Sequence, residues 1–236
     1  MRTFACRPPQ EKGSASGLAA KTFLPSQTWR VAGACKRIFD IVLSFAGLLI
    51  LSPFLTVIAL CIIFDSRGPV FFRGFRTGRY GRSFRIFKFR TMVPEAERLG
   101  GTSTAETDPR ITRVGRFLRK HKLDELPQLL NVLKGEMSIV GPRPEVEEYT
   151  RLYSPEEMQI LSVFPGITDL ASIRFRDLNA LLAQSDDPDY YYANRIRPVK
   201  NQLRLEYVRR QSLWLDLKII FWTLREIWRG SWSTKF

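Results

Sequence analysis

One long apolar stretch constrains this chain more than any other feature. Residues 38–64 read IFDIVLSFAGLLILSPFLTVIALCIIF, and Asp40 is the only charged residue in those 27 positions. An unbroken helix of this length would reach about 40 Å, which exceeds the ~30 Å hydrocarbon core of a bilayer. We therefore expect residues 36–66 to form a membrane helix.

The dipeptide Ser52-Pro53 lies near the midpoint of this stretch. Proline removes a helix hydrogen bond, so a bend is expected there, and each half would span only about 20 Å. Basic residues flank the stretch on both sides: Arg30, Lys36 and Arg37 before it, and Arg67, Arg73, Arg76 and Arg79 after it. Because positive flanks favour the cytoplasm, we expect a re-entrant hairpin with both ends on that side. A kinked transmembrane helix is the alternative.

The charge balance narrows the possible partners and chemistries. Lys and Arg number 37 against 23 Asp and Glu, a formal net charge of +14, which favours an anionic partner. Cys6, Cys35 and Cys61 have neither zinc-site nor disulfide spacing, and any catalytic triad would have to use His121, the single histidine. A divalent metal would therefore be held by carboxylates and substrate phosphates, which suits Mg²⁺.

Most of the excess charge follows the membrane segment directly. From Arg67 to Lys122 there are fifteen Lys or Arg and four acids. Within this region, FFRGFRTGRYGRSFRIFKFRTM alternates basic and aromatic residues around glycines, which predicts a short β-hairpin. Single-stranded nucleic acid would suit such a mixture, but anionic lipid or substrate explains it more simply beside a membrane segment.

The remaining chain predicts an α+β, mostly helical fold. We expect residues 1–30 to be a disordered tail and residues 67–236 to form a cytoplasmic domain, with a short helix over 126–133 that has Pro127 in its first turn. The C-terminal SLWLDLKIIFWTLREIWRG carries Trp214, Trp222 and Trp228 among charges. It predicts an amphipathic helix that lies in the membrane interface or packs on the core.

The block LDELPQ places Asp124 beside Glu125. Adjacent helical residues point about 100° apart, so the two carboxylates do not form a facing pair merely by succession. In a turn or at a helix start, both can reach one phosphate-bound metal, and either can attack phosphorus. The simpler interpretation is an acidic first helical turn, which the helix dipole favours.

Further motifs surround the pair: KFRTM at 88–92, DPRITRVGRFLRK at 108–120, GEMSIVGPRP at 135–144 and PGIT at 165–168. Together they resemble the bacterial sugar transferases of the monotopic polyprenyl-phosphate phosphoglycosyl transferase family. The resemblance covers about residues 36–230, and the chain looks like the minimal catalytic form.

This resemblance implies specific roles. Asp124 would attack the β-phosphate of a UDP-sugar and release UMP. Glu125 and Asp124 would hold the Mg²⁺ ion. Glu125 would also handle the incoming polyprenyl phosphate. Lys88 would belong to the active-site cluster. Arg90, Arg143 and Arg176 would bind substrate phosphates, and Ser52-Pro53 would break the membrane hairpin. Two departures, Gly74 for a common Gln and Asp169-Leu170 for the usual glycine and aromatic, leave the sugar open.

The expected enzyme is therefore a sugar-phosphate transferase at the bacterial inner membrane, with its catalytic domain on the cytoplasmic face. It would use a UDP-sugar, a polyprenyl phosphate such as undecaprenyl phosphate, membrane lipids and Mg²⁺, and no nucleic acid. The oligomeric state stays open, a homodimer included, as do the sugar and the glycan pathway. The competing hypothesis is a non-catalytic basic membrane adaptor for anionic lipid, nucleic acid or a polysaccharide-assembly partner.

Overall fold

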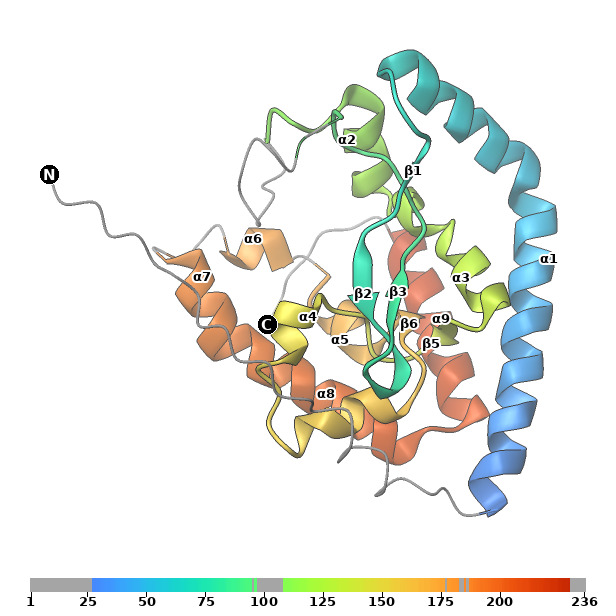
Figure 1. Cartoon of the computed structure of the whole chain (residues 1–236), viewed down its shortest axis with the longest axis vertical. Helices are drawn as coiled ribbons and strands as arrows, with labels where there is room; N and C mark the ends of the chain where they lie inside the picture. The colour runs from blue at the N-terminus through green and yellow to red at the C-terminus, as the bar shows by residue number, and fades with distance from the viewer. Residues whose placement is uncertain are drawn as a thin grey trace, which may run out of the picture.

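The computed structural model describes residues 27–94, 96, 108–176, 178–182, 185 and 187–229. Within them the fold is α+β and mostly helical, as the sequence predicts (Figure 1). The helices are α1 Gln27–Asp65, α2 Arg113–Lys120, α3 Gln128–Lys134, α4 Glu147–Thr150, α5 Leu170–Arg174, α6 Leu178–Leu182, α7 Pro188–Tyr191, α8 Arg197–Arg210 and α9 Leu213–Arg229. The 3₁₀ turns are η1 Arg79–Gly81, η3 Leu123–Glu125 and η4 Glu157–Ser162, and η5 Tyr192–Ile196 is π-helical. The strands are β1 Phe71–Phe72, β2 Phe75–Thr77, β3 Ser83–Arg85, β4 Lys88–Phe89, β5 Ser138–Val140 and β6 Gly166–Thr168.

Helix α1 is one continuous helix with Pro53 inside it, and it bends part-way along (Figure 1). Between Gly33 and Asp65 it is long and apolar enough, by length and composition, to cross a membrane. It begins at Gln27, so residues 27–30 of the predicted tail are helical, and residues 1–26 lie outside the described chain.

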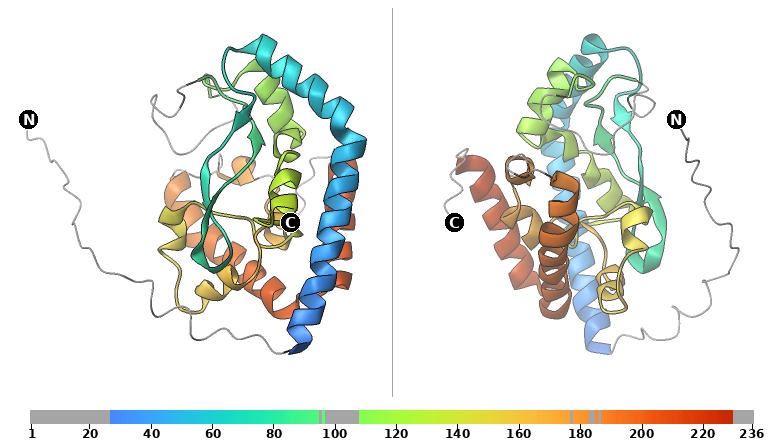
Figure 2. Two further views of the ribbon diagram at one scale, coloured as in Figure 1. Left: turned by 45° about the vertical axis from the view of Figure 1, so that its right-hand side comes forward. Right: turned by 90° about the vertical axis from the view of Figure 1, so that its left-hand side faces the viewer.

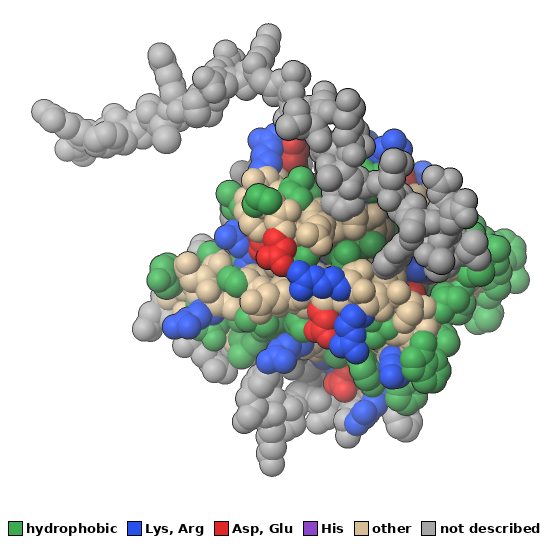
Figure 3. All heavy atoms as spheres, turned by 90° about the horizontal axis from the view of Figure 1, so that it is seen from below, with side chains coloured by type: hydrophobic (Ala, Val, Ile, Leu, Met, Phe, Trp, Pro, Cys, Tyr) green, Lys and Arg blue, Asp and Glu red, His purple; other side chains and the backbone are tan. Residues whose placement is uncertain are grey.

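One face of α1 lies against the domain and the other is exposed. Lys36, Asp40 and Ser44 are buried, and so are Ile58 and Ile62 further along; the spacing of four residues is that of one helical face. Figure 2 shows α1 running along the domain and curving over α2 at its C-terminal end. The exposed face is apolar and carries Ile38, Val42, Phe45, Leu49, Ile50, Phe54, Val57 and Phe64. Figure 3, seen from below, shows apolar side chains gathered on the side of the molecule where α1 runs.

The predicted hairpin forms between β2 and β3, which pair antiparallel with Arg76 opposite Phe84. Its turn uses Gly81 at a φ of 74°, a left-handed conformation that glycine adopts without steric cost. Strands β1 and β4 continue the two arms as a second antiparallel pair. Strand β4 contacts η3, so the hairpin arm carrying Lys88 reaches the acid pair.

A parallel pair, β5 with β6, lies at the centre of the domain, and the sequence did not predict it. Immediately beyond β5 the backbone of Gly141 touches that of Gly166: a Cβ on Gly166 would lie 2.1 Å from the Gly141 nitrogen. Only glycine allows such an approach. The GPRP and PGIT motifs therefore lie directly against each other.

Two apolar clusters form the core of the described residues. The larger joins the hairpin, α3, β5, α8 and α9; its buried members are Phe84, Ile86, Val132, Met137, Ile139, Val140, Tyr207 and Ile219. The smaller joins the second half of α1 to β4 and α2 through Ile58, Ile62, Phe89 and Leu118. Helix α1 thus packs on the same domain that carries the motifs identified in the sequence.

Helix α9 packs on the core, which is one of the two arrangements that the sequence left open. Ile219 is fully buried in the larger cluster, whereas Trp214 is 67% and Phe221 63% exposed. The helix therefore packs on the core with one face and presents an apolar face outward. The side chain of Trp228 lies outside the described residues.

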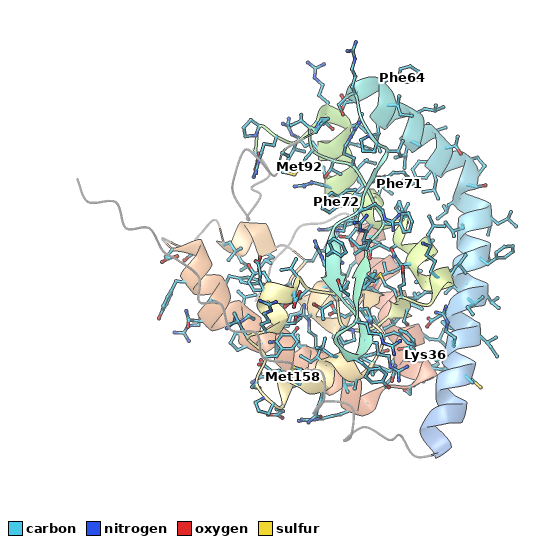
Figure 4. The ribbon with its side chains drawn as sticks, viewed as in Figure 1. Lys36, Phe64, Phe71, Phe72, Met92 and Met158 are labelled. Carbon is cyan, nitrogen blue, oxygen red and sulfur yellow. The ribbon has the colours of Figure 1, made fainter. Side chains whose placement is uncertain are left out.

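A buried polar junction fixes α1 to α9. The Lys36 ammonium, which points from α1 into the domain (Figure 4), lies 2.6 Å from a carboxylate oxygen of Asp216. The other oxygen of Asp216 lies 2.8 Å from the Tyr207 hydroxyl. Since removing one partner of such a pair would strand a buried charge, the junction holds the two helices in one arrangement.

Candidate active site

The acid pair lies on η3, the single turn that precedes α3. Lys122 enters this turn in a left-handed conformation, with φ of 57°, and so reverses the chain after α2. Pro127 occupies the position just before α3, as predicted for a proline in a first helical turn. The two carboxylates therefore sit in a turn at a helix start.

Glu125 is held by two cations. The Lys88 ammonium donates to Oε1 of Glu125 at 2.9 Å. The Arg143 guanidinium donates from Nη1 to Oε2 at 2.8 Å and from Nη2 to Oε1. This bidentate arrangement is the strongest and most directional way in which a protein cation binds a carboxylate. Three of the predicted site residues thus meet at one point.

Asp124 differs sharply from its neighbour. Its side chain is only 8% exposed, yet no hydrogen bond reaches its carboxylate from any described residue. Gln128, one turn further along, is fully buried, and neither atom of its amide has a hydrogen-bond partner in the described chain. This segment therefore contains two buried polar groups without a described hydrogen-bond partner, which is uncommon in native proteins.

The electrostatics separate the two acids. Burial and the adjacent Glu125 raise the pKa of Asp124, against the effect of Lys88, Arg143 and Lys122. Burial would also raise the pKa of Glu125, but Arg143 and Lys88 outweigh it and hold that pKa well below its usual range. Glu125 in turn raises the pKa of Arg143. The two cations thus favour the ionised form of Glu125, whereas Asp124 is a poorly solvated carboxylate whose negative charge is less well stabilised.

Lys88 owes its position to Asn131 on α3. The Asn131 side chain accepts from the Phe87 backbone N–H at 2.8 Å and donates to the Arg85 carbonyl at 2.9 Å. This fully buried amide fastens the strand that leads to β4 directly onto α3. Since η3 runs into α3, the cation and the acid pair are carried by one rigid unit.

Two further cations belong to the site, and the sequence did not single them out. Arg76 on β2 lies within electrostatic range of Arg143 and Glu125; burial and Arg143 lower its pKa while Glu125 raises it. Arg119 on α2 donates to Thr91 at 2.8 Å, and burial lowers its pKa while Asp124 raises it. Both stand in basic segments that the sequence identified, but periodicity does not say which basic residues face the acids.

The structure places the two other predicted arginines elsewhere. Arg90 donates to the carbonyls of Ile62, Ser66 and Arg67, so its guanidinium caps the C-terminal end of α1. Arg176 donates to the Glu226 carbonyl on α9 and lies 3.6 Å from the Glu226 carboxylate. Neither makes a described hydrogen bond to Asp124 or Glu125, and phosphate binding by either stays a prediction.

Ser52 and Pro53, the predicted break in the membrane segment, lie inside α1. Pro53 has no N–H to donate to the Leu49 carbonyl, and the Ser52 hydroxyl donates to that carbonyl instead, at 2.9 Å. The serine therefore satisfies the oxygen that the proline leaves without a partner. This allows a bend in an apolar helix without an unpaired polar group.

A comparison with models of protein families shows the family to which the chain belongs. A family model described as bacterial sugar transferase matches residues 31–230. The chain belongs to the bacterial sugar transferase family. The match covers α1, the hairpin, the acid pair and the C-terminal helices, so it includes every residue of the site described above.

Curated relatives of this transferase carry related names. It is 45% identical over 198 residues to the undecaprenyl-phosphate glucose phosphotransferase of Komagataeibacter xylinus, and 42% over 194 residues to the UDP-glucose:undecaprenyl-phosphate glucose-1-phosphate transferase of Escherichia coli (strain K12). Each match covers 80% of this chain but only 35% and 39% of the respective relative. The exopolysaccharide production protein ExoY of Rhizobium meliloti (strain 1021) is 36% identical over 231 residues, 90% of this chain and 95% of ExoY.

The donor set of this family member suits a hard divalent cation. Mg²⁺ is usually bound through one or two carboxylates, with substrate phosphates and water completing its shell. The described residues contain no cluster of three or more potential metal ligands. Asp124 offers a carboxylate that no described residue hydrogen-bonds, and Glu125 lies next to it, although Arg143 and Lys88 already bind the two Glu125 oxygens. The residues present therefore fit a metal that arrives with a phosphorylated substrate.

Proposed function

We propose that the chain transfers a sugar-1-phosphate from a UDP-sugar to a polyprenyl phosphate, such as undecaprenyl phosphate, and thereby starts the assembly of exopolysaccharide or another glycoconjugate. One observation carries the proposal: Asp124 is buried without a hydrogen bond from any described residue, beside a carboxylate that two cations hold. Burying a carboxylate without a hydrogen bond is unfavourable, which argues for a function that needs it.

The proposed reaction has two half-reactions at one phosphorus. A carboxylate oxygen of Asp124 attacks the β-phosphorus, the bond to the bridging oxygen breaks, and UMP leaves with the electron pair. The phosphosugar then remains on Asp124 as an acyl phosphate. An oxygen of the polyprenyl phosphate attacks the same phosphorus and displaces the Asp124 carboxylate, which restores the enzyme. Ping-pong kinetics follow.

The surrounding cations would supply most of the rate enhancement. Phosphoryl transfer depends mainly on positioning and on stabilising charge at the phosphate oxygens. Arg143 and Lys88, with Arg76 nearby, surround the acids and would bind the donor diphosphate. Glu125 keeps two of these cations in place and would help to receive the acceptor phosphate. Mg²⁺ held by Asp124, Glu125 and the substrate phosphates would neutralise further phosphate charge.

We also propose how the protein meets its membrane. Helix α1 would enter the bacterial inner membrane from the cytoplasmic side as a re-entrant hairpin bent at Ser52-Pro53. The exposed apolar faces of α1 and α9 would lie in lipid, and the basic flanks would face anionic headgroups. This arrangement would leave the acid pair at the surface, where a soluble donor and a lipid acceptor can both reach it.

Release of UMP tests the proposed activity. The protein in membranes or nanodiscs would be incubated with Mg²⁺, undecaprenyl phosphate and a panel of UDP-sugars. We expect UMP from at least one donor, and a loss of about 10³-fold or more in Asp124→Asn. The control is Glu147→Gln, which alters an exposed acid whose one ion pair among the described residues is with Arg151, and it should keep full activity.

The adaptor hypothesis makes the opposite prediction. It requires tolerance of Asp124→Asn and a strong dependence on the total basic charge, with no UMP from any donor. Near-normal turnover of Asp124→Asn would remove the proposed nucleophile.

A further inference from the structure

Arg143, which holds Glu125, is itself held by a second carboxylate. Pro142 and Pro144 flank it, and because proline has no N–H, the Arg143 N–H is the only backbone donor of the three residues. It donates to Oδ2 of Asp169 at 3.0 Å. The other oxygen, Oδ1, accepts from the Ser172 N–H at 2.5 Å and so caps α5. Asp169 thus fixes the GPRP loop to the start of a helix.

A buried arginine on α8 bridges Asp169 to the far side of the same loop. Arg204 is 1% exposed, and its Nη1 donates to the Glu145 carboxylate at 2.6 Å. Its Nε lies 3.6 Å from Oδ2 of Asp169, the oxygen that also accepts from Arg143. Glu145 follows Pro144 directly. One guanidinium therefore connects the two acids on either side of the short segment that carries Arg143.

We propose that Arg204 and Asp169 form a buried positioning device that aims Arg143 at Glu125 and at the donor phosphates. The inference rests on the proposed function, because only there does Arg143 bind phosphate. Neither residue touches the substrate in this proposal; both act through the Arg143 backbone.

Physical reasons favour positioning over plain stability. A buried ion pair contributes little net stability, because desolvation of both charges offsets their attraction. The orientation of a bidentate arginine, in contrast, tolerates little displacement, and a shift of about 1 Å at a catalytic group can reduce the rate by about 100-fold. Asp169 and Arg204 fix the backbone of the GPRP loop, from which the Arg143 side chain reaches Glu125.

The test starts from Asp169→Asn. The Arg143 and Ser172 N–H groups reach different oxygens of Asp169, and asparagine replaces one of these acceptors with an NH₂ donor. It also removes the charge that faces Arg204. We expect kcat/KM for the UDP-sugar to fall about 10- to 100-fold per folded enzyme, mainly through a higher KM. Asp40→Asn is the matched control, since Asp40 is equally buried, accepts from the Ile139 N–H and faces Lys36, but has no described link to Arg143.

A double-mutant cycle separates positioning from a general loss of stability. If Asp169 acts through Arg143, Asp169→Asn has no further effect on UDP affinity, measured by calorimetry, in an Arg143→Gln background. The Asp40→Asn change should leave UDP affinity unaltered in both backgrounds. Additive effects of Asp169→Asn and Arg143→Gln, or an unchanged KM in Asp169→Asn, would overturn the inference. Failure of the unmodified protein to release UMP would instead overturn the proposed function.

Discussion

At the scale of single residues, the adjacent carboxylates Asp124 and Glu125 differ in charge stabilisation because different side chains surround them. The sequence predicted that Asp124, Glu125, Lys88 and Arg143 belong together, and the structure brings them together. It did not indicate that both cations would bind Glu125 and leave Asp124 free. That division depends on which side of η3 faces β4 and the GPRP loop, and such tertiary geometry is absent from a local pattern.

Replacing Lys88 with Met should shift the pH dependence of the reaction. Lys88 lowers the pKa of both Asp124 and Glu125, so its removal raises both values. Because the reaction needs ionised carboxylates, the acid limb of the kcat/KM profile should move to higher pH. Lys134→Met is the control, since it removes a nearby cation that contacts the Phe87 ring and has no described contact with either carboxylate. An acid limb at the same pH in Lys88→Met would show that neither carboxylate governs it.

At the scale of elements, local pattern predicted the structure wherever the cause was local. The apolar run gave α1, the glycine turn gave the β2–β3 hairpin, and Pro127 gave the start of α3. The parallel β5–β6 pair was missed because its strands are three residues long and are separated by the segment that holds α4 and η4. Such pairing depends on the backbone contact of Gly141 with Gly166, which no periodicity reveals.

The bend in α1 should depend on the Ser52 hydroxyl. Ser52→Ala leaves the Leu49 carbonyl without a donor in an apolar helix, which costs about 1–3 kcal/mol. The Thr56 hydroxyl also donates to a helix carbonyl, that of Ser52, but no proline removes the backbone donor there. Thr56→Ala should therefore cost less. Unfolding in detergent or nanodiscs measures both variants, and equal losses would contradict this explanation.

At the scale of the whole molecule, the chain combines an apolar surface on α1 and α9 with a cationic site in one domain. The junction of Lys36 with Asp216 joins residues 180 positions apart. The sequence indicated α1 and α9 as two separate apolar segments. It did not indicate that a buried ion pair joins them. The exposed apolar faces need a partner of the same character, and the proposed bilayer supplies one.

The proposed re-entrant topology predicts the same accessibility at both ends of α1. Cys35 is exposed near the start of the helix, and Arg67 is exposed just after it. In a variant with Arg67→Cys, Cys6→Ser and Cys61→Ser, a membrane-impermeant maleimide should label both positions from the cytoplasmic side only. Labelling of the two positions from opposite sides would establish a spanning helix.

The central claim is that Asp124 carries the sugar phosphate between the two substrates. Intact-protein and peptide mass spectrometry after incubation with Mg²⁺ and the active UDP-sugar, without lipid acceptor, tests it most directly. We expect an adduct of one phosphosugar on the peptide containing Asp124, which disappears when polyprenyl phosphate is added and does not form in Asp124→Asn. UMP released in an amount equal to the enzyme, with the Asp124 peptide unmodified or the adduct on another residue, would contradict the account.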